Sequence, residues 1–200
     1  GQDRPCHLWN LVAHKTRELT AAWEPGGFLA QLTTAGRGST LFPTQQTAIS
    51  AVAEAVFYLD TEVKDLKLAA PLGYKNCASP SCPGAVESPW AERSRPHLRS
   101  NMLGARTLLQ GCDAGGGLGF DDLLEAVGAP MLATQLETRL LAIDAALDAV
   151  PGDSLKQALS SDRPSVERIH DAVKGLTDFL KLEFSMALAI TSKRVEGDHD

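Results

Sequence analysis

Apolar side chains recur at every third or fourth position in three long stretches of this 200-residue chain, residues 44–68, 130–150 and 165–191. An α-helix repeats about every 3.6 residues, so this spacing places them on one helical face. Each such face must be buried against another helix, and we therefore predict an all-α fold, an antiparallel helical bundle. The residues are Ile49, Val52, Val56, Leu59, Val63, Leu66; Leu132, Leu136, Leu140, Ile143, Leu147, Val150; and Val166, Ile169, Val173, Leu176, Leu180, Phe184.

Shorter helices are predicted at residues 96–110 and 119–127, each followed by a glycine, and at about 5–23. No stretch alternates between apolar and polar residues as a half-buried strand does. With 44% hydrophobic and 22% charged residues, the chain has the composition of an ordered protein. We expect residues 1–200 to form a single helical-bundle domain.

The net charge of −6 argues against nucleic acid as the main partner. No apolar run approaches the roughly 20 residues that span a bilayer, so we predict no transmembrane segment. The opening residues, GQDRPCHLWN, contain no apolar core of a signal peptide. We therefore expect any targeting segment to have been removed or to lie outside this sequence.

Two of the four cysteines, Cys77 and Cys82, lie in a proline-rich connector at residues 71–95. A zinc site would need two more ligands at short spacing, and none is present. A disulfide that staples the connector is the better interpretation, and it indicates an oxidising compartment. Cys6 and Cys112 pair with each other, stay free, or bond elsewhere, and the sequence leaves all three open.

Several segments occur in an order that resembles the C-terminal half of an imelysin-like protein. They are KLAAPLG at 67–73, the Cys-x4-Cys connector, VESPWAERSRPHLRSNMLGARTLLQG at 86–111, GLGFDDLLEAVGA at 117–129 and SVERIHDAVKGLTDFLKLEF at 165–184. The resemblance implies an all-helical envelope protein of bacteria, periplasmic or held at the outer membrane as a lipoprotein. It also implies a link to iron uptake, with iron as a possible cofactor and envelope iron-uptake components as partners.

The same family has been labelled a metallopeptidase (M75) because of a G-x-H-x-x-E motif in its N-terminal half. This chain contains no such motif. The resemblance therefore implies that the main metal ligands belong to an upstream half that this sequence does not include, and that this half would be a partner. No metal-ligating residue can be assigned in this chain from the resemblance.

The resemblance places a ligand-binding cleft beside the polar residues of the segment before and within the predicted helix at 96–110. These candidate ligand-binding residues are Glu87, Ser88, Arg93, Ser94 and Asn101. The alternative is structural, with Ser88 or Ser94 capping the helix and Glu87 paired with Arg93 at the surface. Glu167 and His170 have the E-x-x-H spacing of di-iron bundles, but the motif occurs once, so we expect a solvated helix face there.

Three functions are compatible with these observations. We favour a non-enzymatic binding module of the envelope, linked to iron or haem uptake. Half of a metallopeptidase would require a metal-activated water and a general base, and neither is visible in the sequence. A structural domain that contacts another protein is the third possibility.

Overall fold

The computed structural model describes residues 4–112 and 117–191, with the backbone alone for residues 4–8. In this part of the chain every regular element is a helix, which confirms the predicted all-α fold. The chain groups into two compact units, Gly1–Val52 and Ala53–Asp200.

The first unit contains α1 (Arg4–Ala22), α2 (Phe28–Thr33) and most of α3 (Gln45–Val56). Its small core consists of three buried residues, and one phenylalanine and one leucine of α2 pack against them. The rings of Trp23 and Phe28 meet edge to face at 5.2 Å. The buried and packing residues are Ala35, Phe42, Ala48, Phe28 and Leu32.

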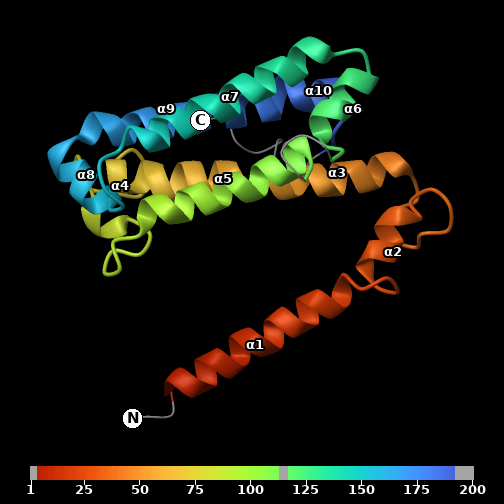
Figure 1. Ribbon diagram of the computed structural model, residues 1–200, viewed down its shortest axis with the longest axis horizontal. Helices are drawn as coiled ribbons and strands as arrows, with labels where there is room; N and C mark the ends of the chain where they lie inside the picture. The colour runs from red at the N-terminus through yellow and green to blue at the C-terminus, as the bar shows by residue number, and fades with distance from the viewer. Residues whose placement is uncertain (1–3, 113–116, 192–200) are drawn as a thin grey trace. The chain divides into compact units, whose positions relative to one another are not determined.

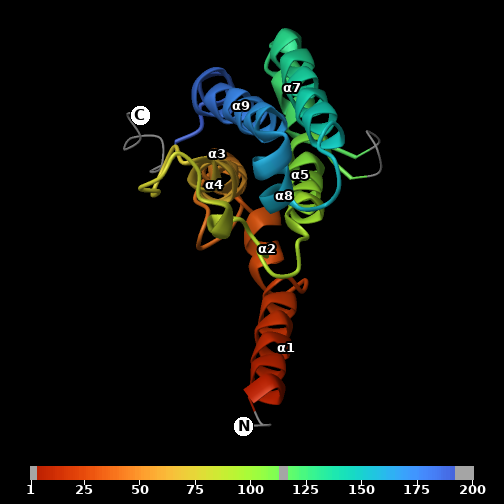
Figure 2. The same ribbon diagram turned by 90° about the vertical axis from the view of Figure 1, so that its left-hand side faces the viewer.

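The second unit is the helical bundle (Figures 1 and 2). Its long elements are η1 (Leu59–Ala69), α5 (Ser94–Gln110), α7 (Pro130–Asp148) and α9 (Arg163–Phe179), and successive members run in opposite directions in Figure 1. Shorter helices join them or extend them. These are α4 (Ala70–Leu72), η2 (Pro83–Ala85), α6 (Phe120–Ala126), α8 (Leu155–Ser161), η3 (Leu180–Phe184) and α10 (Ser185–Ala187).

Helix α9 packs against both α7 and η1, and α5 contacts α6, α7 and η1. The predicted apolar stripes of 130–150 and 165–191 form most of this core, since nearly all of their members are buried. Leu132 alone is half-buried. The short helix α8 was not predicted from the sequence. At its start the Ser154 hydroxyl accepts a hydrogen bond from the backbone N–H of Gln157.

The predicted helix at 44–68 is the one that differs most from expectation. It continues from α3 into η1, a π-helix, instead of remaining α-helical. A π-helix has more residues per turn, and the step between buried aliphatic residues accordingly increases from four, Leu59 to Val63, to five, Val63 to Leu68. Leu66, predicted to be in the apolar stripe, is therefore 47% exposed.

Candidate functional site

A pocket of about 330 Å³ opens in the second unit between η1 and α9. Its walls come from η1, from the chain just after α4, from α9 and from η3. Four of the nine lining residues are lysines, so the pocket is unlike the apolar core around it. The lining residues are Lys64, Asp65, Ala69, Tyr74, Lys75, His170, Lys174, Asp178 and Lys181.

Three charged residues of η1 are buried, and two of them, Lys64 and Asp65, line this pocket. Asp60, Lys64 and Asp65 are 5%, 6% and 8% exposed. The Lys64 Nζ lies 2.8 Å from Asp60 Oδ1 and 3.5 Å from Asp65 Oδ1. Burying an ion costs several kcal/mol unless partners compensate, so a charged cluster in a helical bundle is a candidate functional feature. The π-helical form of η1 supports the same interpretation, because π-helical segments are frequent at functional sites.

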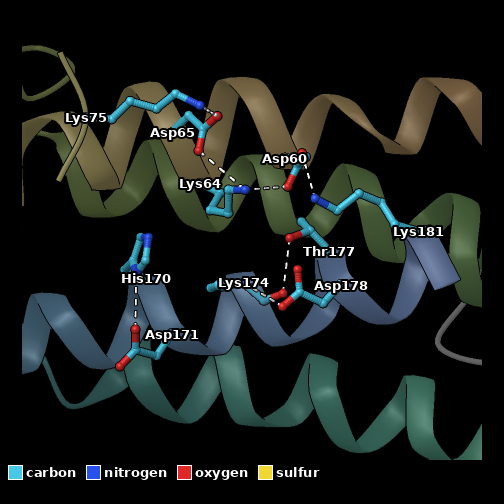
Figure 3. A network of polar contacts seen from close by, with 10 residues as sticks. All are labelled: Asp60, Lys64, Asp65, Lys75, His170, Asp171, Lys174, Thr177, Asp178 and Lys181. Carbon is cyan, nitrogen blue, oxygen red and sulfur yellow. Dashed lines mark hydrogen bonds and ion pairs between the residues drawn. The ribbon is translucent and has the colours of Figure 1, made fainter. Parts of the chain in front are cut away.

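Two further lysines extend this cluster into a continuous row of alternating charges (Figure 3). Lys75, after α4, places its Nζ 2.8 Å from Asp65 Oδ2. Lys181, on η3, places its Nζ 3.2 Å from Asp60 Oδ2. The row therefore begins and ends with a lysine, and each aspartate lies between two ammonium groups. We call Lys75, Asp65, Lys64, Asp60 and Lys181 the charged row.

The charged row also determines the ionisation of its central residue. Burial opposes the charge of the Lys64 ammonium and lowers its pKa, but the hydrogen bond and the charge of Asp60, followed by those of Asp65, outweigh burial. The net effect is that the pKa of Lys64 is raised. Lys64 therefore stays a cation at neutral pH although its side chain is buried.

Helix α9 forms the opposite wall (Figure 3). His170 is 9% exposed, and its Nδ1 lies 3.0 Å from Asp171 Oδ1. One turn further along, Lys174 Nζ donates to Asp178 Oδ2 at 2.7 Å, and both side chains are about half exposed. The prediction of a solvated helix face is thus wrong for His170, because η1 and the chain after α4 cover that side of α9.

Tyr74 links the pocket to the connector. Its ring meets the His170 ring edge to face at 5.2 Å, and its hydroxyl donates to Glu167 Oε1 at 3.1 Å. Burial, and then the hydrogen bond to Glu167, raise the pKa of Tyr74, so the phenol stays neutral. Hydrogen bonds from Arg163 and then from Tyr74 lower the pKa of Glu167. Glu167 therefore serves as an anionic acceptor for Arg163 and Tyr74.

Arg163 holds the connector onto the start of α9. Its Nη2 donates to the Leu72 carbonyl and its Nη1 to the Pro80 carbonyl, both at 2.9 Å, while Nε donates to Glu167. Gly73 lies between these attachments with φ +83°, and a Cβ there would come within 2.5 Å of the Pro80 oxygen. The two limbs of the connector can approach this closely because residue 73 is a glycine.

The predicted Cys77–Cys82 disulfide is present in the connector, with a Cα–Cα distance of 6.2 Å. Cys82 N also donates to the Pro71 carbonyl at 2.9 Å. Cys112 is free and exposed in the structure of this chain, and a bond to a part of the protein outside it stays an open alternative. The side chain of Cys6 lies outside the described residues.

The predicted ligand-binding residues divide into two groups. Glu87 and Asn101 are brought together by Lys67, whose Nζ lies 2.9 Å from Glu87 Oε2 and 2.7 Å from Asn101 Oδ1. Ser88 joins them through His97, since its Oγ lies 3.2 Å from His97 Nδ1, which in turn is 3.7 Å from Glu87 Oε1. This cluster connects η1, the connector and α5, and none of its members lines the pocket described above.

Arg93 and Ser94 lie apart from that group. Arg93 Nη1 forms an ion pair with Asp153 Oδ2 at 2.9 Å, not with Glu87. Ser94 is 1% exposed, and its hydroxyl donates to the Glu87 carbonyl. The structural alternative was therefore wrong in its details, because α5 begins without a side-chain cap and Glu87 pairs with Lys67. The predicted ligand-binding role of these five residues stays a prediction.

The sequence analysis did not identify the charged row. Its residues are separated by as many as 121 positions, from Asp60 to Lys181, and they belong to no short motif. One signal was available: Asp60 and Lys64 are four apart and each follows a residue of the apolar stripe, Leu59 or Val63. Oppositely charged residues beside an apolar stripe can be drawn into a helix contact together.

Within 4–112 and 117–191, no three His, Cys, Asp or Glu side chains come together as a possible metal site. The described residues thus do not fit a bare iron ion, since four of the nine residues that line the pocket are lysines, whose ammonium groups are not metal ligands. None of the helices in these ranges is long and apolar enough to cross a membrane.

Comparison with known proteins gives one match. A family model described as Imelysin, Peptidase M75, matches residues 8–182, which include the whole connector, the charged row and the predicted ligand-binding residues. The comparisons with curated proteins and with solved structures give no match.

Proposed function

Because the chain belongs to the imelysin family, we propose that it is a non-enzymatic binding module of the bacterial cell envelope that acts in iron or haem uptake. The observation that carries the binding role is the pocket between η1 and α9 with its buried Lys64 and Asp65, and with Asp60 paired to Lys64 beside it. Charged groups buried at a pocket of this size are typical of a site that orients a polar ligand. No nucleophile or metal-bound water is needed for that role.

The proposed location is the periplasm, or the outer membrane through a lipid anchor. The Cys77–Cys82 bond supports an oxidising compartment, because disulfides persist outside the reducing cytosol. Envelope iron-uptake components and an upstream half of the same protein are the proposed partners. The cluster of Glu87, Ser88 and Asn101 is the surface that we propose for contact with a ligand or with that half.

The described residues offer no cluster for a bare metal ion, so the proposed cargo is iron inside an organic complex. The test is a titration of the purified chain with ferric chloride, ferric citrate and haemin, followed by absorbance and by calorimetry. We expect saturable binding of ferric citrate or haemin and no saturable binding of ferric chloride. Repeating the titration with an added upstream half shows whether binding becomes tighter when that half is present.

Two outcomes would count against this function. If the chain cleaves a protein substrate and a chelator abolishes the cleavage, the metallopeptidase interpretation is correct. If neither iron complex binds in the presence or absence of the upstream half, a role in protein–protein contact replaces the proposed one.

A further inference from the structure

We infer that the pocket between η1 and α9 recognises its ligand through carboxylate or phosphate groups, so that the group it binds is an anion and not a metal. This inference rests on the proposed function only in taking the pocket as the ligand site. It names the chemical class of the ligand as a small organic acid or a phosphorylated small molecule.

The first argument is the sign of the charge. The charged row contains three lysines, Lys75, Lys64 and Lys181, and two aspartates that lie between them. On the other wall, Lys174 and Asp178 balance each other. Among the side chains that line the pocket, four are lysines and two are aspartates, so ammonium groups outnumber carboxylates in the lining and favour an anionic ligand.

The second argument is that the positive groups are held in place before a ligand arrives. Asp60 and Asp65 each bind two ammonium groups, and both carboxylates are almost completely buried. Fixed donors bind an anion better than mobile ones, because less conformational entropy is lost on binding. Placing a buried carboxylate between neighbouring ammonium groups also limits the repulsion between lysines while the pocket is empty of ligand.

The third argument concerns how the ligand enters. Lys174 and Asp178 form an ion pair at helical i, i+4 spacing, and their side chains are 51% and 43% exposed. Such an exposed pair is worth little, so the Lys174 ammonium can exchange Asp178 for a ligand oxygen at small cost. Lys174 is thus the most accessible cation of the pocket and the one whose replacement should leave the fold intact.

The pocket volume of about 330 Å³ is at the lower end for small-molecule sites. It suits a compact molecule with several charged oxygens. A lysine ammonium is a compact point charge with three donors, and it accepts carboxylate and phosphate alike. The experiment must therefore separate these two sources of the same charge.

The test is isothermal calorimetry of the purified chain with three iron-free probes: citrate, inorganic phosphate and trimethyl citrate. Citrate and its trimethyl ester share a carbon skeleton but differ in charge, so the ester reports binding that does not depend on the anion. We expect citrate or phosphate to bind, the ester not to bind, and the affinity to fall as salt is raised. Binding of citrate alone identifies carboxylates as the recognised group, and binding of phosphate alone identifies phosphates.

The variant for this test is Lys174→Gln, with Lys15→Gln as the matched control. Lys15 also forms an exposed helical ion pair, with Glu18, but lies on α1. We expect Lys174→Gln to weaken anion binding by about three- to tenfold and Lys15→Gln to leave it unchanged. Equal affinities for the two variants, binding of the ester, or no binding of either anion would each overturn the inference.

Failure of the inference can be told apart from failure of the proposed function. If iron-free citrate or phosphate binds in a Lys174-dependent way and no iron complex binds better than its iron-free form, the anion site stands and the iron role is lost. If an iron complex binds equally well to the wild-type chain and to Lys174→Gln, the iron role stands at another site and the inference is wrong.

Discussion

Helix α9 packs against α7 and against η1, and these two contacts differ in chemistry. Both α7 and α9 bury aliphatic residues, such as Leu140 and Ile143 of α7 and Val173 of α9. The η1–α9 contact includes buried Asp60 and Lys64 and the half-exposed pair of Lys174 and Asp178. One helix thus has an apolar neighbour that stabilises the bundle and a charged neighbour that encloses a pocket.

The two contacts differ in how much they contribute to the stability of the fold. Burial of aliphatic side chains contributes about 25 cal/mol for each Å² removed from water, without any directional requirement. A buried ion pair contributes little net stability, because the cost of removing both ions from water offsets their attraction. We therefore propose that the charged contact serves binding, whereas the apolar contact stabilises the bundle.

The largest expected effect is on stability, from a change in the α7–α9 contact. Leu140 is 1% exposed, and Leu140→Ala should lower the free energy of unfolding by about 2–5 kcal/mol, because it removes buried methyl groups and leaves a cavity. Chemical denaturation measures this loss. The neighbouring Leu141, 54% exposed, is the control, and Leu141→Ala should change stability by less than about 0.5 kcal/mol. Similar losses for both would contradict the assignment of this contact as the stabilising core.

An intermediate effect is expected from the charged row. Asp60→Asn removes the charge that faces Lys64 and Lys181 and should lower the free energy of unfolding by about 1–3 kcal/mol. The double variant Asp60→Leu, Lys64→Met replaces the pair with apolar groups and should be as stable as the wild type or more so.

Citrate or phosphate binding by calorimetry is the second measurement on the same variants. The double variant should lose anion binding while keeping its stability. If it were as unstable as Asp60→Asn, the charged row would be a stabilising element and the comparison between the two contacts would fail.

The smallest expected effect is on the pH dependence of stability. The pKa of Lys64 is higher in the folded protein than in the unfolded chain, because Asp60 and Asp65 outweigh burial. Its contribution is therefore fully present below about pH 10 and is lost as the pH rises through the folded pKa. Thermal unfolding between about pH 9 and pH 11 should show a smaller loss for the double variant than for the wild type. If the stability of the wild type and of the double variant fell equally with rising pH, the charged form of Lys64 would not be stabilised by folding.

The sequence predicted the fold well where packing is apolar. The spacing of Leu136, Leu140, Ile143 and Leu147 predicts both the helix α7 and the face that it buries. Aliphatic side chains are unfavourable in water, so residues that share one helical face are buried together. The Cys77–Cys82 bond followed from the short spacing and the lack of other ligands.

The sequence did not predict the π-helix or the pocket. The change of register in η1 buries Asp60 and Lys64 and exposes Leu66, and no propensity distinguishes that outcome from a continuous α-helix. The charged row depends on Lys75 and Lys181 arriving from distant segments, which is a result of tertiary packing. Lysine and aspartate are common surface residues, so neither type alone indicates a site.

The Arg163 attachment has a consequence for how mutations in the connector combine. The guanidinium joins the carbonyls of Leu72 and Pro80, and the disulfide bridges the same short loop covalently. Because both ties constrain one loop, we expect the effects of removing them to be non-additive. The stability of the Arg163→Ala, Cys77→Ser double variant should differ from the sum of the two single losses, which is epistasis between a hydrogen-bonded and a covalent tie.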